Sequence, residues 1–517
     1  MGVVEEITPY LTKWYTILIG ASVVYFIANY IRYLKFYKAH GCKEPPYAMG
    51  RIEAIKVLFN TLKCMHTGTV LSYQNKFFCN GQPLTQQMDI PGMKVLATMD
   101  PDNIKALLAT QFTDFGLGDR HAHFLPTLGN GIFTLDGEGW KHSRQVLRPQ
   151  FAREQVAHVK SLEPHIQWFA DHIRAKKGMP FDIQELFFRF TIDTATEFLF
   201  GDSVHSLWDD EIGKVDTRSI QGKDTFASDF NVVQVYLAAR AYSQSLYWLH
   251  NSREFKRLTK KVRDFGRHYV DEVLALSEDE LDKRSNSGYI FLYELAKKTR
   301  DPVALLDQAL NILVAGRDTT AGLMSFAMFE LARNPKVWEK LRDEVERTFG
   351  VGEDADPNDI TFESLKQCEY LKQIINETLR MYPSVPTNFR TCLKETTLPN
   401  GGGPDGKAPV YVAKGTCVLY SVYFMQRREE FYGKDASEFK PERWEDLKNL
   451  GWSYLPFNGG PRICLGQQFA LTEASYVLVR LAQLFPKLTC EDARPYPPNM
   501  QLHLTLSHFD EVKISMA

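Results

Sequence analysis

Cys464 is the residue whose surroundings first indicate chemistry. It lies in a glycine-rich bend, FNGGPRICLG over residues 457–466, directly before a predicted helix over 467–484. A lone cysteine is usually a small buried hydrophobic residue, but the glycines of this bend let the backbone turn tightly and approach a flat partner closely. Backbone N–H groups near a helix N-terminus stabilise a thiolate over a thiol. The bend therefore predicts an ionised sulfur, with Arg462 able to reach an acidic edge of a partner above it.

A second chemical pair, Asp318 and Thr319, lies in an apolar helix predicted over about residues 305–333. A carboxylate beside a hydroxyl is suited to the controlled delivery of protons, although threonines in a helix also bond to their own backbone carbonyls. Gly316 in a helix interior costs about 1 kcal/mol relative to Ala, so it should have a steric purpose. The segment predicts either a proton relay beside a widened groove or an ordinary buried helix.

The elements around these residues are predicted to be mostly helical. Residues 150–350 are rich in apolar positions with helical spacing, whereas residues 391–420 read as strand, turn and strand. The charged stretch over 277–286 is predicted to be a solvated loop. No clear linker divides residues 46–517, so we expect one α-dominated domain with small β elements at one side.

Composition narrows the class of protein. The 517 residues include 61 Lys and Arg against 63 Asp and Glu, which gives a formal net charge of −2 and argues against nucleic acid as a partner of the whole protein. A hydrophobic fraction of 44% excludes a mainly disordered chain. The eight cysteines contain no C-x-x-C pair, which argues against a disulfide scaffold and a structural zinc site and suits a reducing compartment.

Residues 14–31 predict a membrane anchor. They carry no charged side chain, and at about 1.5 Å per residue they cover a hydrocarbon core of about 30 Å. Basic residues follow this segment and acidic residues precede it, so the positive-inside rule places residues 1–13 in the lumen and residues 51–517 in the cytosol. Residues 32–50 form a basic, proline-containing linker. A cleavable signal peptide is the alternative, and the acidic start and the basic exit oppose it.

The bend around Cys464 resembles the haem-binding loop of the cytochrome P-450 family, F-x-x-G-x-R-x-C-x-G. The matching residues are Phe457, Gly460, Arg462, Cys464 and Gly466. The resemblance covers essentially the whole chain and implies the P-450 fold, mainly α with small β-sheets, behind an N-terminal transmembrane helix. It also implies that Cys464 is the thiolate ligand of the haem iron, where electron donation favours O–O cleavage, and that Arg462 contacts a haem propionate.

The same resemblance gives roles to the predicted relay. Asp318 and Thr319 match the acid-alcohol pair of the family, which delivers protons to bound dioxygen, and Gly316 matches the glycine of its oxygen groove. Animal fatty-acid ω-hydroxylases carry a Glu before that glycine and use it to attach haem covalently. This chain has Ala315 there, so we expect noncovalent haem b.

Charged pairs on single helix faces complete the resemblance. Glu377 and Arg380 are spaced i, i+3, a pattern that alone usually means a weak surface ion pair; in the family this pair joins an Arg equivalent to Arg443 in a buried network that braces the haem loop. The further haem-propionate contacts implied by the family are Trp140, Arg144 and Arg390.

The segments 115–118, 129–140 and 398–406 look like the fungal branch that hydroxylates alkanes and fatty acids. That branch implies insertion of one oxygen atom at or near the end of a long aliphatic chain, with electrons from NADPH through NADPH-cytochrome P-450 reductase and with cytochrome b5 as a further partner. It also implies a single-pass protein of the endoplasmic reticulum membrane. Positions relative to the family's substrate loops suggest that Phe115, Phe124, Val385, Pro386 and Leu502 line the substrate cavity, against the alternative of ordinary core packing.

Three other functions stay open at this point. The chain could oxidise an intermediate of a specialised metabolite, or it could be a self-sufficient isomerase or peroxygenase, although such enzymes typically lose the acid-alcohol pair. It could also be a haem-binding sensor without turnover. NADPH oxidation coupled to product formation, and absent without reductase, separates a monooxygenase from the isomerase, peroxygenase and sensor.

Overall fold

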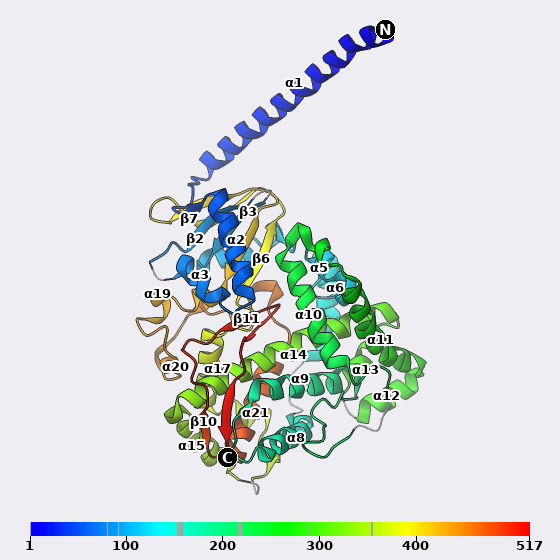
Figure 1. Ribbon diagram of the computed structural model, residues 1–517, viewed down its shortest axis with the longest axis vertical. Coiled ribbons are helices and arrows are strands. Elements are labelled where there is room, and N and C mark those ends of the chain that lie inside the picture. The colour runs from blue at the N-terminus through cyan, green and yellow to red at the C-terminus, as the bar shows by residue number, and fades with distance from the viewer. Residues whose placement is uncertain are drawn as a thin grey trace.

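The computed structural model describes residues 2–79, 81–90, 93–151, 159–215, 220–287, 289–352 and 355–517. Helix α1 (Gly2–Ala39) leaves the rest of the molecule as a long rod (Figure 1). Residues Ile17–Ala39 are long and apolar enough to cross a membrane, and none of the 18-residue window tested is buried. The last turns of α1 contact the domain, because Arg32 pairs with Glu395 at 3.2 Å and the rings of Tyr33 and Tyr411 lie 4.8 Å apart. Helix α1 therefore ends against the rest of the molecule.

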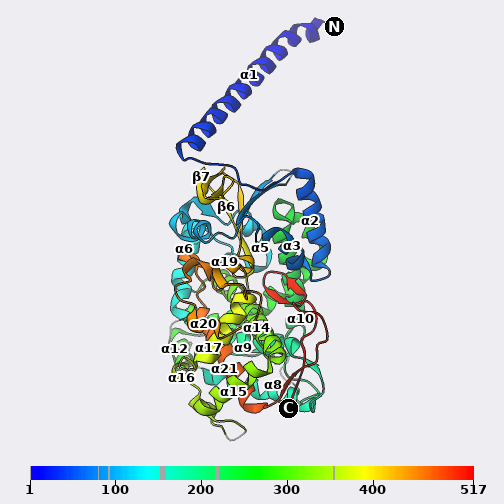
Figure 2. The same ribbon diagram turned by 90° about the vertical axis from the view of Figure 1, so that its left-hand side faces the viewer.

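Strands β2, β3, β6 and β7 lie at the end of the domain from which α1 leaves, whereas β10 lies at the opposite end near the C-terminus (Figure 1). Figure 2 shows β6 and β7 at the same end from the side. The largest sheet has the order β1-β2-β3-β9-β6-β4, in which β9 pairs parallel with β3 and antiparallel with β6. β7 and β8 form a separate antiparallel hairpin. These strands are β1 (Ala48–Met49), β2 (Thr85–Ile90), β3 (Met93–Thr98), β4 (Phe115–Gly116), β6 (Thr387–Cys392), β7 (Thr396–Gly402), β8 (Ala408–Val412) and β9 (Cys417–Ser421). The smaller sheets are built from β5 (Phe181–Asp182), β10 (Leu488–Cys490), β11 (Met500–Leu502), β12 (Leu506–His508) and β13 (Lys513–Met516).

Helices form the rest of the domain. The longer ones are α2 (Arg51–Met65), α3 (Val70–Phe78), α5 (Arg120–Leu128), α6 (Gly137–Leu147), α8 (Glu163–Ala175), α9 (Ile183–Phe200), α10 (Phe226–Tyr242), α11 (Arg253–Ala275), α12 (Glu278–Ser287), α14 (Pro302–Arg333), α15 (Pro335–Phe349), α17 (Glu369–Met381) and α21 (Gln467–Leu484). Short helices are α4 (Pro101–Lys105), α13 (Phe291–Ala296), α16 (Phe362–Leu365), α18 (Val422–Met425), α19 (Glu429–Tyr432) and α20 (Arg443–Asp446). The mainly helical architecture with small β-sheets that the sequence predicted is confirmed.

Helix α14 is the centre of the domain. It begins three residues before the predicted start, because Pro302 occupies its first turn and the carboxylate of Asp301 accepts a hydrogen bond from Val303 N at 3.0 Å. Its first half, up to Val314, packs in one hydrophobic core with α5, α10 and α11. Its second half, from Ala321, packs in another core with α9, α17 and α21. Residues 315–320, which include the predicted relay, fall between the two cores.

The prediction of a loop over 277–286 is wrong, because this stretch contains helix α12 (Glu278–Ser287). Ser277 caps the helix by accepting the N–H of Glu280, and the carboxylate of Glu280 accepts the N–H of Ser277 in return. Leu281 supplies the packing, since it is only 2% exposed. One buried leucine and a reciprocal cap were enough to order a segment that is otherwise polar.

Candidate active site

The bend at Cys464 is shaped by its contacts with backbone. Gly460 has φ +66°, and a Cβ on it would lie 1.9 Å from the carbonyl oxygen of Leu108. Only glycine can take this conformation at so close an approach. Cys464 N donates to Phe457 O at 3.0 Å, and Gly466 begins α21 by accepting from Ala470 N. The glycine at 460 therefore serves the packing of the bend on the segment Ala106–Thr110, whereas a Cβ at position 466 would make only an ordinary contact, 3.8 Å from the ring of Phe151.

The sulfur of Cys464 faces an interior hollow. The residue has a large exposed area although it lies deep in the molecule, so its open surface must belong to an internal space. Burial raises the pKa of the thiol, whereas the N–H of Gly466 and the charge of Arg144 lower it. A bound metal cation would reverse the burial effect and hold the sulfur as a thiolate.

Three buried guanidiniums lie near this bend. Arg462 pairs with Asp136 at 2.7 Å and lies 4.3 Å over the ring of Trp140. Arg390 donates to Phe389 O at 2.8 Å, and Arg120 donates to the side-chain oxygen of Asn388 at 2.7 Å. Burial and then the charge of Arg390 lower the pKa of Arg120 to about 9. Burial also lowers the pKa of Arg462 to about 10, against the opposing effect of Asp136.

This arrangement fits a haem group. The charge of Arg390 lowers the pKa of both Arg120 and Arg462. The three guanidiniums share one paired carboxylate among the described residues, so the cluster carries excess positive charge that two propionates would neutralise. The sulfur and the hollow lie beside the cluster. Arg144 is placed differently from Arg390 and Arg462: its Nη1 donates to Ile463 O at 2.9 Å, and it braces the bend itself.

Arg120 is a site residue that the sequence reasoning missed. It is the first residue of α5 and follows the segment 115–118 that was noted only for its resemblance to a fungal branch. Its signal is the burial of a charge beside other charges, which one sequence does not display. The close approach depends on strand β6, which carries Asn388 and Arg390 on neighbouring positions.

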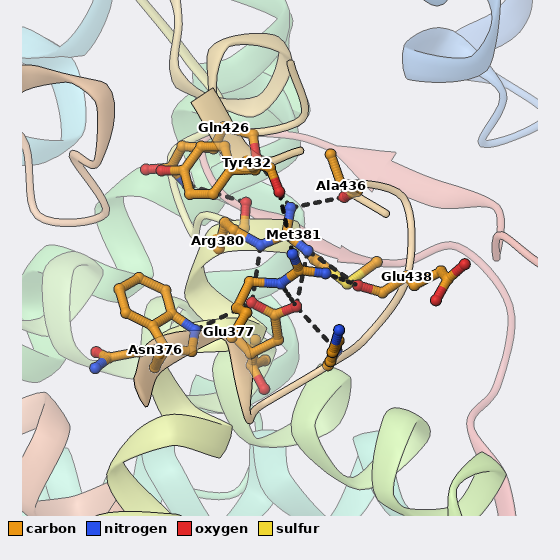
Figure 3. Close-up of polar contacts among 12 residues, drawn as sticks. Asn376, Glu377, Arg380, Met381, Gln426, Tyr432, Ala436 and Glu438 are labelled. Carbon is orange, nitrogen blue, oxygen red and sulfur yellow. Dashed lines mark hydrogen bonds and ion pairs between the residues drawn. The ribbon is translucent and has the colours of Figure 1, made fainter. Parts of the chain in front are cut away.

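Glu377 and Arg380 lie in a closed network of polar contacts (Figure 3). Arg443 belongs to the same network. Glu377 receives two bonds of 2.8 Å from Arg380 and one of 2.7 Å from Arg443. Trp444 Nε1 adds a bond of 3.0 Å to the same carboxylate. The other guanidinium N–H groups donate to backbone carbonyls, among them Gln426 O and Ala436 O from Arg380, and Arg443 also donates to the carboxylate of Asp435. Both Glu377 and Arg380 are completely buried.

The network is linked to the bend by neighbouring bonds. The side-chain oxygen of Gln426 accepts from Leu455 N at 2.8 Å, just before the Phe457–Gly466 motif. Tyr454 OH donates to Asn376 O at 3.2 Å, beside Glu377 on α17. Trp452 packs against Gly459, where a Cβ would lie 2.7 Å from the ring. The charged network thus holds the segment that enters the bend.

The predicted relay residues on α14 make different contacts. Thr319 Oγ1 donates to Ala315 O at 2.6 Å, which is the back-bonding expected of any helical threonine. The carboxylate of Asp318 pairs with the neighbouring Arg317 at 2.8 Å. A Cβ on Gly316 would meet nothing within 4 Å, so open space lies beside α14 at this point.

The five candidate substrate residues are divided among several environments. Phe115 and Leu502 are buried in the core of the β-rich end, and Phe124 is buried in the helical core around α10 and α11. Val385 is 36% exposed, and the carbonyl of Pro386 accepts from Tyr423 N at 3.0 Å. The structure does not bring these five side chains into one cluster.

Tyr242 also indicates an internal space, which the sequence did not predict. Tyr242 is 39% exposed but lies deep in the molecule, so like Cys464 it borders an internal space. Its hydroxyl donates to His503 O at 3.4 Å, in the turn between β11 and β12. Burial lowers the pKa of His503, which keeps its imidazole neutral. α10 and the β11–β12 turn therefore meet at this internal space.

Comparisons with known proteins agree on one family. Residues 51–514 match the family described as Cytochrome P450. The chain is 57% identical to "Cytochrome P450 52A3-B" of Candida maltosa over 517 residues, which covers 99% of both chains. It is 55% identical to "Cytochrome P450 52A13" of Debaryomyces hansenii over 514 residues, again 99% of both chains. Among solved structures, the haem domain of cytochrome P450DA shares the fold with a TM-score of 0.67 at 20% identity, over 88% of this chain and 91% of that chain.

Proposed function

This chain belongs to the cytochrome P450 family, whose members are haem-thiolate monooxygenases, and we propose that it hydroxylates a long-chain aliphatic substrate at or near the terminal carbon. The observation that carries the proposal is the sulfur of Cys464, which opens on an interior hollow beside a cluster of arginines with excess positive charge. Bound haem supplies the iron at which dioxygen is activated so that one oxygen atom can enter a C–H bond.

We propose that Cys464 holds the haem iron through its thiolate. The N–H of Gly466 and the charge of Arg144 stabilise the negative sulfur. Arg390 and Arg462 bind the propionates, together with Arg120, and Trp140 supports Arg462 from beneath its guanidinium. Phe457, Gly460 and Gly466 shape the bend. Since residue 315 is Ala and offers no carboxylate, the haem is held noncovalently.

Asp318 and Thr319 deliver protons in this proposal. The hydroxyl of Thr319 donates its hydrogen to Ala315 O, so its oxygen stays free to accept a hydrogen bond from a proton donor. The carboxylate of Asp318 passes protons to Thr319, and Gly316 leaves the space that dioxygen needs. Glu377, Arg380 and Arg443 act on the reaction only by holding the bend.

The substrate class follows from the hollow and the anchor. An enzyme tethered to a bilayer can take amphiphiles from it, and an apolar cavity stabilises each buried methylene by about 0.8 kcal/mol. Phe115, Phe124, Val385, Pro386 and Leu502 stay candidate contacts, and Tyr242 is added to them. The full-length similarity to 52A members from two yeasts supports the same branch.

Topology and partners complete the proposal. α1 anchors the chain in the endoplasmic reticulum membrane, with residues 1–13 luminal, 14–31 in the bilayer, 32–50 as the linker and 51–517 as the cytosolic haem domain. A redox partner must supply two electrons per turnover, and we assign this role to NADPH-cytochrome P450 reductase, with cytochrome b5 as an accessory donor. A specialised metabolite with a lipid tail is the second candidate substrate.

The test uses microsomes that contain the full chain. Reduced wild-type protein should give the red-shifted carbon monoxide band of a thiolate-bound haem, and Cys464→Ser should abolish it. Incubation with NADPH, reductase and a series of alkanes and fatty acids should give terminal or near-terminal alcohols. An unchanged carbon monoxide band in Cys464→Ser would overturn the ligand assignment, and product formation without reductase would overturn the monooxygenase mechanism.

A further inference from the structure

Arg317 joins α14 to α10. Its Nη1 donates to the carboxylate of Asp318 at 2.8 Å and also to the side-chain oxygen of Asn231 in α10. The guanidinium lies 5.0 Å from the ring of Phe188 in α9. Arg317 is only 3% exposed, so three helices meet at one buried cation.

The two acceptors depend on the same nitrogen. Asp318 and Asn231 both bond to Nη1, while Nε of Arg317 is buried and has no hydrogen-bond partner among the described residues. Burial lowers the pKa of Arg317 and the charge of Asp318 raises it again, so the ion pair keeps the guanidinium charged. A buried cation that loses its partner costs several kcal/mol, so the guanidinium must follow its acceptors. A shift of α10 therefore moves the shared N–H group and with it the carboxylate.

Asn231 lies on the same face of α10 as Tyr242, away from the hydrophobic core. Asn231, Val235 and Tyr242 are spaced i, i+4 and i+11, which places them on one side of a helix. Val235 is 47% exposed, and Tyr242 opens on internal space. The opposite face, with Phe230, Val233 and Leu237, is fully buried in the core shared with α11 and α14. The Asn231 face is therefore the one that core packing leaves for a substrate.

We infer that Arg317 is a positioning residue that couples the seating of α10 over the substrate to the placement of the Asp318 carboxylate. The inference rests on the proposed function, because Asp318 matters only as part of the proton relay. With α10 seated against α14, the shared Nη1 holds Asp318 where it can serve Thr319. With α10 displaced, the bond to Asn231 breaks and the carboxylate loses that fixed position, so proton delivery becomes dependent on an occupied hollow.

The experiment compares three variants of the full haem-loaded chain: Asn231→Leu, Arg317→Gln and the double variant. Asn231→Leu removes the bond to α10 and leaves Asp318, Thr319 and Arg317 in place. The matched control is Asp229→Asn, which breaks the 3.0 Å ion pair with Lys261 and so loosens the same helix from α11 instead of from α14. The first measurement is amide hydrogen exchange of α10 in the oxidised protein without NADPH. The second is hydrogen peroxide released per NADPH, with hexadecane or hexadecanoic acid, whichever gives more product in the wild type.

We expect Asn231→Leu to exchange faster in α10 and to release about fivefold more peroxide per NADPH, a coupling of ordinary size. The double variant should release no more peroxide than Arg317→Gln alone, because both changes remove one connection. Asp229→Asn should speed exchange in α10 without raising peroxide release. A wild-type peroxide fraction in Asn231→Leu, or an equal rise in Asp229→Asn, would overturn the coupling. Loss of the carbon monoxide band and of product in the wild type would instead refute the proposed function, and the exchange comparison does not depend on it.

Discussion

Two groups of buried arginines serve the bend at Cys464, and their charges are met in different ways. In the closed network, Arg380 and Arg443 share the carboxylate of Glu377, and Asp435 pairs with Arg443 at 2.9 Å. Arg443 and then Lys440 lower the pKa of Asp435 to about 2. Two cations thus meet two carboxylates, and the protein satisfies the network by itself.

The open cluster of Arg120, Arg390 and Arg462 lacks this balance. Arg462 pairs with Asp136. Arg120 and Arg390 instead donate to uncharged oxygens in β6, the side-chain oxygen of Asn388 and the carbonyl of Phe389. The lowered pKa values of Arg120 and Arg462 record burial together with repulsion from Arg390. Buried arginines that the protein neutralises with its own carboxylates have a structural role. Buried arginines that it does not neutralise indicate a site for a bound anion.

The largest expected effect is in the closed network. Glu377→Gln leaves two buried guanidiniums facing an uncharged amide, and breaking a buried pair in this way costs about 3–5 kcal/mol. We expect little haem-loaded protein and a much lower urea midpoint, measured by the carbon monoxide band per protein and by tryptophan fluorescence. Glu445→Gln is the control, because it changes an exposed carboxylate on the short helix α20 that also carries Arg443, and it should change stability by less than about 0.5 kcal/mol. Equal midpoints for the two variants would show that the network does not brace the bend.

A third kind of buried charge gives the second prediction. Glu473 on α21 accepts from Thr194 Oγ1 at 2.9 Å, and burial raises its pKa to about 7 despite that bond, the nearby His165 and Thr320. The folded protein therefore binds a proton that the unfolded chain, with a pKa of 4.5, has already lost. Stability from this group is complete below about pH 4.5 and falls by up to about 3 kcal/mol as pH rises to about 7.

Glu473→Gln should remove this slope. The difference in unfolding free energy between variant and wild type should favour the variant increasingly from pH 5 to pH 8, because only the wild type must ionise a buried carboxyl. Urea midpoints at several pH values give the difference directly. A difference that stays constant with pH would mean that Glu473 is ionised and paired like Glu377.

These contrasts show what one sequence can predict. Helix α21 has the bounds expected from its apolar pattern, and α14 differs by three residues at a capped start. The Cys464 motif is contiguous, so its residues could be named without the fold. The link between Glu377 and Arg443 spans 66 positions, and it was expected only because the family resemblance supplied it.

Contacts without such a motif stayed hidden. Arg317 and Asn231 are 86 positions apart and meet only because α10 packs on α14. Arg120 becomes a site residue when strand β6 places Asn388 and Arg390 beside it. Whether the protein neutralises a buried charge depends on contacts between residues far apart in the sequence. Residue types and local spacing do not predict those contacts.

The third prediction uses the open cluster. Arg390→Leu should leave the urea midpoint of the haem-free protein unchanged or higher, because it removes a repelled buried charge. The haem-loaded form should lose haem about tenfold faster, since a charge-assisted bond to a propionate contributes about 1.5 kcal/mol or more. Haem transfer to apomyoglobin measures the rate.

Haem dimethyl ester sharpens this result, because its propionates carry no charge. Wild type should hold the ester less tightly than haem, and Arg390→Leu should show little further loss with the ester. If Arg390→Leu weakened both forms equally, the arginine would act on the fold and not on the propionate. Arg380→Leu, in the closed network, provides the contrast, since it should unfold the haem-free protein as well.

The smallest expected effect on stability comes from two glycines of α14, one beside open space and one packed against backbone. A Cβ on Gly316 meets nothing within 4 Å, whereas a Cβ on Gly322 would lie 2.5 Å from the carbonyl oxygen of Leu506. Gly316→Ala should therefore raise the free energy of unfolding by about 0.5–1 kcal/mol, because Ala loses less entropy in a helix. Gly322→Ala should lower it, since the backbone of β12 must move. The same substitution on one helix would then change the free energy of unfolding in opposite directions. Equal stabilisation of both variants would show that the space at Gly316 is not specific to it.

The substitution at Gly316 should also affect the reaction. Gly316→Ala should raise peroxide release per NADPH although the protein is more stable, because the methyl group occupies the space that the reaction needs.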